Sequence, residues 1–228
     1  RIYSVASTSD SIFNTGEIVT IIANSGDGAD TSSNHVTCVL YASDTMSCYG
    51  ENQNGVLGDG SRTDRTNPVD VQFFSGSGTP TSIALHDESD PRTICTLMDD
   101  GDVYCWGEDG SLGIPNACTL YAAYCEGARL TRPAAALNFG SISSPVTSIA
   151  GTHDYYPRTC AVHEDGTATC RGQSGYYGAL GNGYVSTSSS SPTQVILPGG
   201  SGDVLSISLL DDWSCTLMED GDVYCLSL

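Results

Sequence analysis

The chain has 228 residues, 39% of them hydrophobic and 15% charged, which suffices for one large all-β domain or two small ones. No stretch approaches the roughly 18 consecutive apolar residues of a membrane span, so we expect no membrane insertion. The formal net charge is −19 and all eight basic residues are arginine, which argues against nucleic acid as a partner and rules out lysine-based catalysis.

The first 17 residues precede the repeating part of the chain. They lack the apolar core and the cleavage site of a signal peptide, so we expect an exported protein in its mature form or a fragment of it. Residues 2–5 are β-prone and have no strand partner in a repeat of their own. We therefore predict that 1–17 is an N-terminal strand segment able to complete a blade.

Eight of the ten cysteines form pairs in which nine residues separate the two members. The pairs are Cys38 with Cys48, Cys95 with Cys105, Cys160 with Cys170, and Cys215 with Cys225. A three-residue loop at 99–101, a type I turn followed by a left-handed glycine, makes Cys95 face Cys105. Directly opposed residues of an antiparallel pair lie within disulfide range. The spacing therefore predicts four disulfide-stapled hairpins, with Asp44 in the left-handed position of the first.

Zinc binding is the competing interpretation of these cysteines. Zinc sites favour cysteines separated by about two to four residues and need four converging ligands, and the four histidines do not recur at one offset from the cysteines. We therefore predict disulfides. Cys118 and Cys125 lie in an insertion, 114–127, and are expected to pair with each other in a surface loop. Disulfides in this number indicate a secreted protein, extracellular or at a cell surface.

The hairpins belong to a longer repeat, whose period is typical of propeller blades or solenoid coils. Each hairpin follows a β-prone segment, at 18–23, 81–84, 146–150 and 204–207. In the first three copies a glycine turn, a Leu-Gly step and a proline come after it. We predict an all-β fold of about four units, at about 18–75, 76–140, 141–198 and 199–228, the last of them incomplete. Each unit is too small to bury a sheet face alone, so the units must stack.

The sequence pattern resembles the regulator of chromosome condensation repeat, in its disulfide-containing extracellular bacterial version. Residues 95–107, CTLMDDGDVYCWG, match best, and 146–153 supply the strand that precedes such a hairpin. The resemblance extends over 18–228 and implies β-propeller blades of four strands. Tyr49, Arg171 and Leu226 stand where the family often has tryptophan, and Ser227 replaces the expected glycine.

The number of repeats is small for a propeller of this family, which usually closes with about seven blades. The last copy stops three residues after Cys225, with neither the Leu-Gly step nor the proline. Three arrangements remain open. The ends join in a small ring, the chain is a fragment of a longer propeller, or the N-terminal segment of one copy completes the last blade of another. The third is a heterologous contact, which builds rings or filaments.

Catalytic and cofactor motifs do not stand out, because the sequence has no nucleophile elbow, phosphate-binding loop, H-E-x-x-H or dinucleotide fingerprint. We predict no enzyme activity, no cofactor and no metal site. His35 lies three residues before Cys38, but that cysteine is assigned to a disulfide. The Asp-Gly-Asp clusters at 99–102 and 220–222 are explained by the turns themselves rather than by calcium.

Two groups of residues are candidates for contacts or modification. Aromatic contact area for a protein, a glycan or neighbouring copies is predicted at Tyr155, Tyr156, Tyr176, Tyr177 and Tyr184. A Ser/Thr run before Pro192 is either a solvated loop or an O-glycosylated surface, comprising Ser186, Thr187, Ser188, Ser189, Ser190 and Ser191.

These features favour a non-catalytic extracellular structural or interaction protein that self-associates head to tail into a filament or surface assembly. The alternative is a protein-binding module such as an adhesin or an enzyme inhibitor, since the family that the repeat resembles includes an inhibitor of β-lactamase. A polysaccharide-acting enzyme is less favoured, because no pair of carboxylates is singled out. The expected partners are further copies of the chain, another protein or a glycan.

Overall fold

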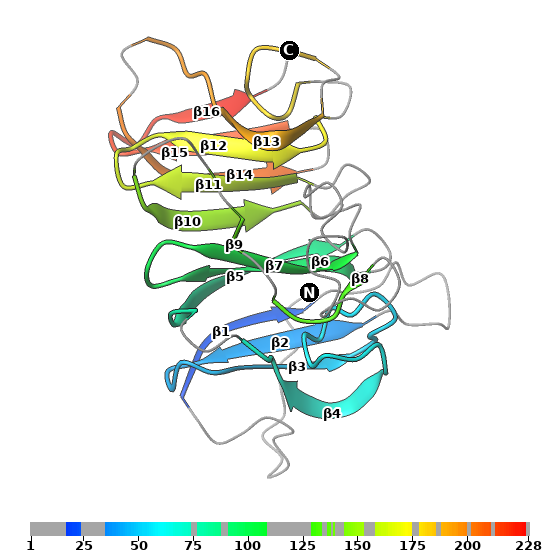
Figure 1. Ribbon diagram of the computed structural model, residues 1–228. Helices are drawn as coiled ribbons and strands as arrows, with labels where there is room; N and C mark the ends of the chain where they lie inside the picture. Colours follow the sequence, from blue (N-terminus) through cyan, green and yellow to red (C-terminus); the bar gives the residue numbers. More distant parts are fainter. Residues whose placement is uncertain are drawn as a thin grey trace, which may run out of the picture.

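The computed structural model contains four antiparallel sheets stacked in chain order, with the first and fourth sheets at opposite ends of the stack (Figure 1). The described part of the chain contains no helix, and hence none able to cross a membrane. The predicted all-β class is confirmed. The structure describes residues 17–23, 35–73, 77–87, 91–108, 129–133, 136–137, 139, 144–152, 158–174, 178–185, 188–199, 202–210 and 213–226.

The first two sheets are built from nine strands. The first sheet contains β1 (Ile18–Ala23), β2 (Val36–Tyr41), β3 (Met46–Gly50) and β4 (Arg65–Asp70). The second contains β5 (Pro80–Asp87), β6 (Pro91–Met98), β7 (Val103–Glu108), β8 (Arg129–Leu130) and β9 (Ala136–Leu137). Both short strands, β8 and β9, pair with β7, so together they take the place that β4 has in the first sheet.

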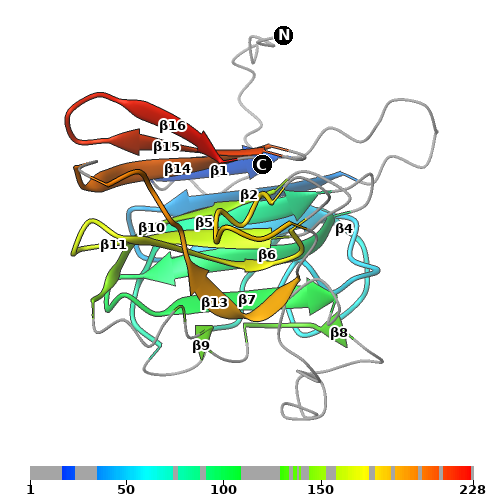
Figure 2. The ribbon, with the colours of Figure 1, turned by 90° about the horizontal axis from the view of Figure 1, so that it is seen from above.

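The third sheet repeats the four-stranded arrangement and the fourth sheet has three strands among the described residues. The third contains β10 (Val146–Gly151), β11 (Arg158–His163), β12 (Ala168–Gly172) and β13 (Ser189–Gln194). The fourth contains β14 (Val204–Leu210), β15 (Trp213–Met218) and β16 (Val223–Leu226). Seen from above, β1 and β14 lie towards one edge of the stack, and β8, β9 and β13 towards the opposite edge (Figure 2).

The middle of each sheet is the predicted disulfide hairpin. In every hairpin the two cysteines are directly opposed in register and bonded, with Cα atoms 4.0–4.1 Å apart. The bonds join Cys38 to Cys48, Cys95 to Cys105, Cys160 to Cys170, and Cys215 to Cys225. Cys48 on β3 and Cys170 on β12 are completely buried. These four predicted disulfides are confirmed, and Cys118 and Cys125 lie outside the described residues.

The hairpin loops have the predicted three-residue geometry. In the second hairpin the Met98 N–H donates to the Asp102 carbonyl at 2.8 Å, and Gly101 is left-handed with φ +87°. Asp44 takes the left-handed position of the first hairpin at φ +65°, as predicted. The same loop length therefore sets the opposed register of the cysteines in each sheet.

The turn chemistry explains the acidic residues of the hairpins. The Asp100 carboxylate accepts a hydrogen bond from the Asp102 N–H at 3.0 Å, and Asp220 accepts one from the Asp222 N–H at the same distance. This is the local side chain to backbone bonding that favours aspartate in turns. These Asp-Gly-Asp clusters therefore have a structural role that needs no cation.

Neighbouring sheets pack front to back. We call the face that carries the disulfide the front face, and the opposite face of the same sheet the back face. Strand β5 lies against β1 and β2, β10 against β5 and β6, and β14 against β10 and β11. The back face of each following sheet places an isoleucine in the contact, and Ile83, Ile149 and Ile207 are only 7–8% exposed. The disulfides of the first three sheets are buried in these contacts, within two apolar clusters that together span all four sheets.

The loops that leave each hairpin fasten adjacent sheets together. Trp106, directly after the second disulfide, is fully buried, and its Nε1–H donates to the Val56 carbonyl of the preceding unit at 2.8 Å. A Cβ at Gly58, the glycine of the first Leu-Gly step, would lie 3.0 Å from Trp106 Nε1. Leu226 occupies the equivalent place against Gly181, where a Cβ would lie 2.6 Å from Leu226 Cδ1. The glycine of the Leu-Gly step therefore leaves space for the side chain that follows the second cysteine of the next hairpin.

Arginine replaces tryptophan at this position in the third sheet. Arg171 is buried, its Nη2 donates to the Ser190 carbonyl at 2.5 Å, and its guanidinium carbon lies 5.9 Å from the centroid of the Phe139 ring. Burial lowers the pKa of Arg171 from its ordinary value. A second buried arginine, Arg158 on β11, donates to the carbonyl oxygens of Leu210 and Trp213, the latter at 2.9 Å. Arg158 thus ties the third sheet to the start of β15.

A buried carboxylate organises the loop of the first unit. Asp59 forms an ion pair with Arg65 at 2.6 Å and accepts hydrogen bonds from Ser61 and from the side-chain amide of Asn52. Burial raises the pKa of Asp59, but the hydrogen bonds from Ser61 and Arg65 outweigh it, so the pKa lies below its ordinary value. The ionised form of Asp59 therefore stabilises the fold.

The hairpin glycines provide a test of the stacking. Gly166→Ala and Gly221→Ala both strain a left-handed backbone, at about 1–3 kcal/mol each. At Gly166 the new Cβ would also overlap the carboxyl group of Asp203, which directly precedes β14 of the fourth sheet, whereas at Gly221 it meets nothing within 4 Å. We expect Gly166→Ala to lower the free energy of unfolding by about 1 kcal/mol more, measured by urea denaturation. Equal losses would contradict the proposed contact between hairpin and next sheet.

The Asp59 network predicts a pH dependence. Because the folded pKa is depressed, stability from this group is complete above its unfolded pKa near 3.8 and is lost as the pH falls through the folded pKa. We expect Asp59→Asn to cost about 1–3 kcal/mol at pH 7, with a smaller difference from the wild type below pH ~3.8. Thermal melts across this range measure the effect. Glu219→Gln, which removes a charge from an exposed hairpin loop, is the control and should cost little.

Candidate functional site

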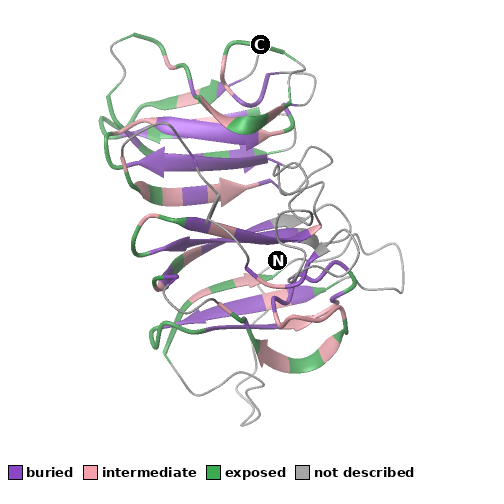
Figure 3. Cartoon of the chain, viewed as in Figure 1, coloured by how far each residue is buried: buried purple, intermediate pink, exposed green. Residues whose placement is uncertain are grey.

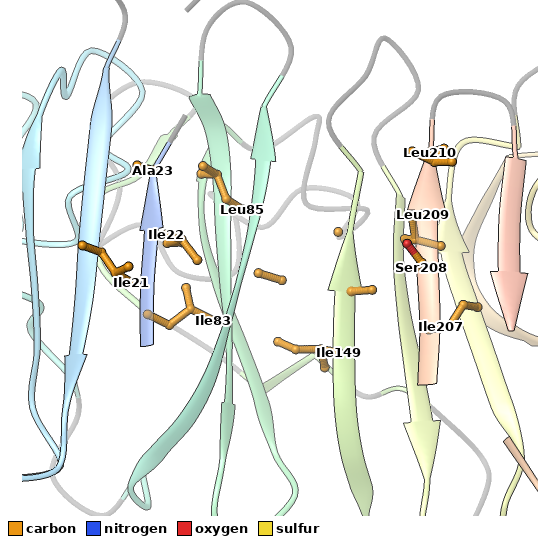
Figure 4. Close-up of a pocket in the computed structure, with 13 residues that line it drawn as sticks. Ile21, Ile22, Ala23, Ile83, Leu85, Ile149, Ile207, Ser208, Leu209 and Leu210 are labelled. Atoms are coloured by element: carbon orange, nitrogen blue, oxygen red, sulfur yellow. The ribbon is translucent and has the colours of Figure 1, made fainter. Parts of the chain in front are cut away.

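The first strands of the four sheets together line a groove. Residues at matching positions of β1, β5, β10 and β14 enclose about 570 Å³. Figure 4 shows Ile22, Ile83 and Leu85 between β1 and β5, with Ile149 on β10 further along. The lining is Ile21, Ile22, Ala23, Ile83, Ala84, Leu85, Ile149, Ala150, Gly151, Ile207, Ser208, Leu209 and Leu210. None of these side chains is charged, so the groove suits apolar contact rather than acid–base chemistry.

The front face of the fourth sheet is a second candidate surface, because nothing among the described residues covers it. Its side chains, assigned from the strand register, are Ser206, Ser208, Leu210, Trp213, Cys215, Leu217, Val223 and Cys225. All are exposed or half-buried. The three preceding sheets bury the equivalent positions of their hairpin strands, and exposed residues recur along the fourth sheet where β11 and β12 are largely buried (Figure 3).

Residues at equivalent positions of the fourth sheet and the earlier sheets differ strongly in exposed fraction. Val223 is 61% exposed, whereas Val103 in the second sheet is 0% exposed. Leu217 is 39% exposed, whereas its counterpart Leu97 is 4% exposed. Trp213 is 51% exposed and precedes the disulfide by two residues, a position that Arg158 fills at 1% exposure in the third sheet. The fourth front face therefore has the composition of a buried interface without its neighbour.

The back face of the first sheet is also incompletely covered. Ile21 occupies the same register position as Ile83, Ile149 and Ile207, opposite the residue that follows the first hairpin cysteine. Ile21 is 58% exposed, and Ile18 on the same face is also exposed. On the neighbouring strand β2, Val39 and Tyr41 of the same face are 0% and 3% exposed, so only the β1 part of this back face is open. The stack thus presents a bare front face at one end and exposed β1 isoleucines at the other.

The outer edge of the fourth sheet is open as well. Strands β3, β7 and β12 each pair with a further strand, whereas β16 pairs only with β15 in the described part of the chain. Beside β16 lies a small cavity of about 250 Å³, lined by residues that include Gly181, Ile196, Tyr224 and Leu226. Uncovered strand edges are places where natural proteins accept a further strand or cover. Residues 1–16, the predicted blade complement, lie outside the described residues.

Charge is arranged around the front face of the fourth sheet rather than on it. None of the eight side chains of that face is ionisable in the disulfide-bonded protein, since both cysteines are bonded. Glu219, Asp220 and Asp222 are exposed in the hairpin loop at its end, and Asp211 and Asp212, between Leu210 and Trp213, lie outside the described residues. A neutral apolar face on a chain of net charge −19 is a locally distinct surface.

Of the remaining sequence candidates, the structure describes Tyr184 and the serines at 188–191. Tyr184 is 67% exposed in the loop after the third Leu-Gly step. Ser188–191 lie at and just before the start of β13, where Ser190 accepts the hydrogen bond from Arg171. Residues 155, 156, 176, 177, 186 and 187 lie outside the described residues. The described residues contain no group of three or more His, Cys, Asp or Glu side chains arranged to hold a metal.

The histidines of the described part have structural surroundings. The backbone carbonyl of His35 accepts a hydrogen bond from the Glu51 N–H at 2.9 Å. His163 is buried, with Nε2 2.8 Å from Thr169 Oγ1 and Nδ1 3.2 Å from the Ser144 carbonyl. The contacts of His163, with a threonine hydroxyl and a backbone carbonyl, fit a packing role for this buried side chain.

No protein-family model and no curated protein matches the sequence. Among solved structures, human WBSCR16 matches 93% of the chain with a TM-score of 0.69 and 15% identity. Prp20p from Saccharomyces cerevisiae, the yeast RCC1, matches 79% of the chain with a TM-score of 0.63 and 21% identity. The fold is that of an RCC1-like β-propeller. The chain spans only 48% and 41% of these two structures, so its four sheets correspond to less than half of either.

The RCC1-like fold confirms the architecture that the repeat pattern implied. Sequence identities this low are evidence for a shared fold and not for a shared function. The extracellular bacterial version of the repeat stays a prediction. Sequence reasoning missed the bare front face. A signal for it was absent, because residues 95–105 and 215–225 differ only at Asp99 and Glu219, yet one hairpin is buried and the other is exposed.

The bare face predicts unequal disulfide reactivity. In dilute protein, a mild reductant should open Cys215–Cys225 before the other three described disulfides, because attack requires access to a sulfur and Cys225 is exposed. Alkylation followed by peptide mass spectrometry gives the order of opening. Cys95–Cys105 is the matched control, since it has nearly the same sequence and is buried. Equal alkylation of the two hairpins would contradict the exposure of the fourth front face.

Proposed function

We propose that this chain is a non-catalytic extracellular structural protein whose propeller-type sheets associate head to tail with further copies. The observation that carries the proposal is the uncharged front face of the fourth sheet, which presents Trp213, Leu217 and Val223 to solvent. Soluble monomers rarely leave a continuous apolar sheet face bare, and such patches mark interaction sites. The disulfide hairpins support an oxidising location outside the cell.

The high negative charge determines how such an assembly responds to salt. Each copy carries a formal charge of −19, so copies repel one another over distances beyond contact. Salt screens this repulsion, with a Debye length of about 8 Å at physiological ionic strength, while apolar contact persists. Association between copies is therefore expected to strengthen as salt is added.

A second candidate function is binding of an unrelated protein. The study of Prp20p concerns its binding properties to Gsp1p and histones, so a protein with this fold binds other proteins. Exposed Tyr184 and the apolar groove offer contact area for an adhesin- or inhibitor-like role in this chain. The bare terminal face favours self-association over this alternative, because it repeats the composition of contacts within the chain. Glycan binding and O-glycosylation of the Ser/Thr run stay predictions.

Light scattering and sedimentation test the proposal. We expect a weight-average mass above the 23.8 kDa of one chain, rising with protein concentration and with sodium chloride. Sucrose at matched viscosity is a control for effects unrelated to charge screening. A mass of one chain at every concentration and salt level would exclude self-association and leave the protein-binding alternative.

A further inference from the structure

We infer that the self-association contact joins the front face of the fourth sheet of one copy to the back face of the first sheet of a second copy. This inference rests on the proposed self-association and adds the two surfaces that meet. The occupant of the bare front face is therefore a second copy of the same chain.

The internal contacts of the chain supply the template. Each of the three junctions between sheets is formed by a front face with its disulfide and by the isoleucine of the following back face. Ile83 meets the first sheet, Ile149 the second and Ile207 the third, all 7–8% exposed. One pattern of contact thus holds the whole stack, and the stack ends only because no further sheet is present among the described residues.

The two ends of the stack are the two halves of that same contact. At one end Leu217, Val223 and the Cys215–Cys225 disulfide occupy the positions that Leu97, Val103 and Cys95–Cys105 bury in the second sheet. At the other end Ile21 occupies the register position of the three buried isoleucines and is 58% exposed. Val39 and Tyr41 on the same face are already buried within the chain, so the exposed part of this end is the β1 isoleucines. A front-to-back contact between copies places those isoleucines against the bare front face, as in the internal junctions.

A contact between the front faces of the fourth sheets of two copies would cover fewer of the exposed apolar residues. Within the described part of the chain, each of the first three front faces packs against a back face that carries an isoleucine, and not against another front face. A contact between two front faces would also leave Ile21 and Ile18 of both copies exposed. Front-to-back contact is heterologous, so it closes into a ring or continues as a filament. Two copies supply eight sheets, which is within the range of about four to eight blades of closed propellers.

The experiment uses one substitution at each end. Ile21→Glu places a charge on the back face and Leu217→Glu places one on the front face. Both residues are exposed in the single chain, at 58% and 39%, so folding should be retained, which circular dichroism checks. We expect each variant alone to be a monomer of 23.8 kDa, and an equimolar mixture to form a dimer of twice that mass. In the mixture, the unchanged front face of the fourth sheet of the Ile21→Glu chain can meet the unchanged back face of the first sheet of the Leu217→Glu chain.

Disulfide protection identifies which faces meet in the mixed dimer. The Cys215–Cys225 disulfide of the Ile21→Glu chain should be protected from reduction, whereas that of the Leu217→Glu chain should stay reactive. Mass spectrometry distinguishes the two, because residue 217 lies between the two cysteines. Val223→Glu is a second front-face variant and should behave as Leu217→Glu does. Val185→Glu, at an exposed position on neither face, is the matched control and should assemble like the wild type.

The outcomes separate this inference from the proposed function. A monomeric wild type overturns the proposed self-association itself. A wild type that assembles while Ile21→Glu assembles equally well overturns the front-to-back contact and indicates a front-to-front dimer if Leu217→Glu is monomeric. Loss of assembly in Val185→Glu, or a mixture that stays monomeric, also overturns it.

Discussion

A small sheet with two apolar faces cannot bury both by itself, and the rest of this structure depends on that constraint. In the part of the chain that the structure describes, each sheet has three to five strands, a disulfide on one face and an isoleucine on the other. Neither face is stable in water unless another sheet covers it. Stacking front to back meets both needs with one repeated contact, which explains why four sheets form a single stack. It also means that a stack which does not close has two unfinished ends.

The disulfides have two roles in this arrangement. In the hairpin, each closes a short loop and fixes the strand register, with a contribution of about 2–3 kcal/mol in the chain-entropy description. In the stack, the buried cystine is a compact apolar group at the centre of the front face. The first three described disulfides have both roles, whereas Cys215–Cys225 has only the first within one chain. The fourth hairpin therefore carries a feature of sheet packing that only another molecule, or a further sheet, can use.

Acidic side chains and apolar faces are kept apart. The hairpin loops use aspartate for turn bonding and present it to solvent, as at Asp100, Asp165 and Asp220. The hairpin strands of the front faces are apolar or weakly polar, apart from buried Arg158 at the edge of the third, and Arg65 lies on the outer strand of the first. This separation maintains solubility through net charge without placing charge in the contacts. It also makes the bare front face compatible with an otherwise strongly repulsive surface.

The sequence by itself determined the hairpins. The nine-residue spacing specified opposed cysteines, the three-residue loop and the left-handed Asp44, because strand pairing and turn geometry are local and alternate with a period of two residues. The repeat of those hairpins also specified the all-β stack. The sequence did not reveal the partner of Trp106, whose acceptor Val56 lies 50 residues away. Nor did it distinguish Val103 from Val223, which have the same local sequence and are 0% and 61% exposed. Only the tertiary structure decided which faces are covered, because burial is a property of the neighbouring sheet and not of the residues that are buried.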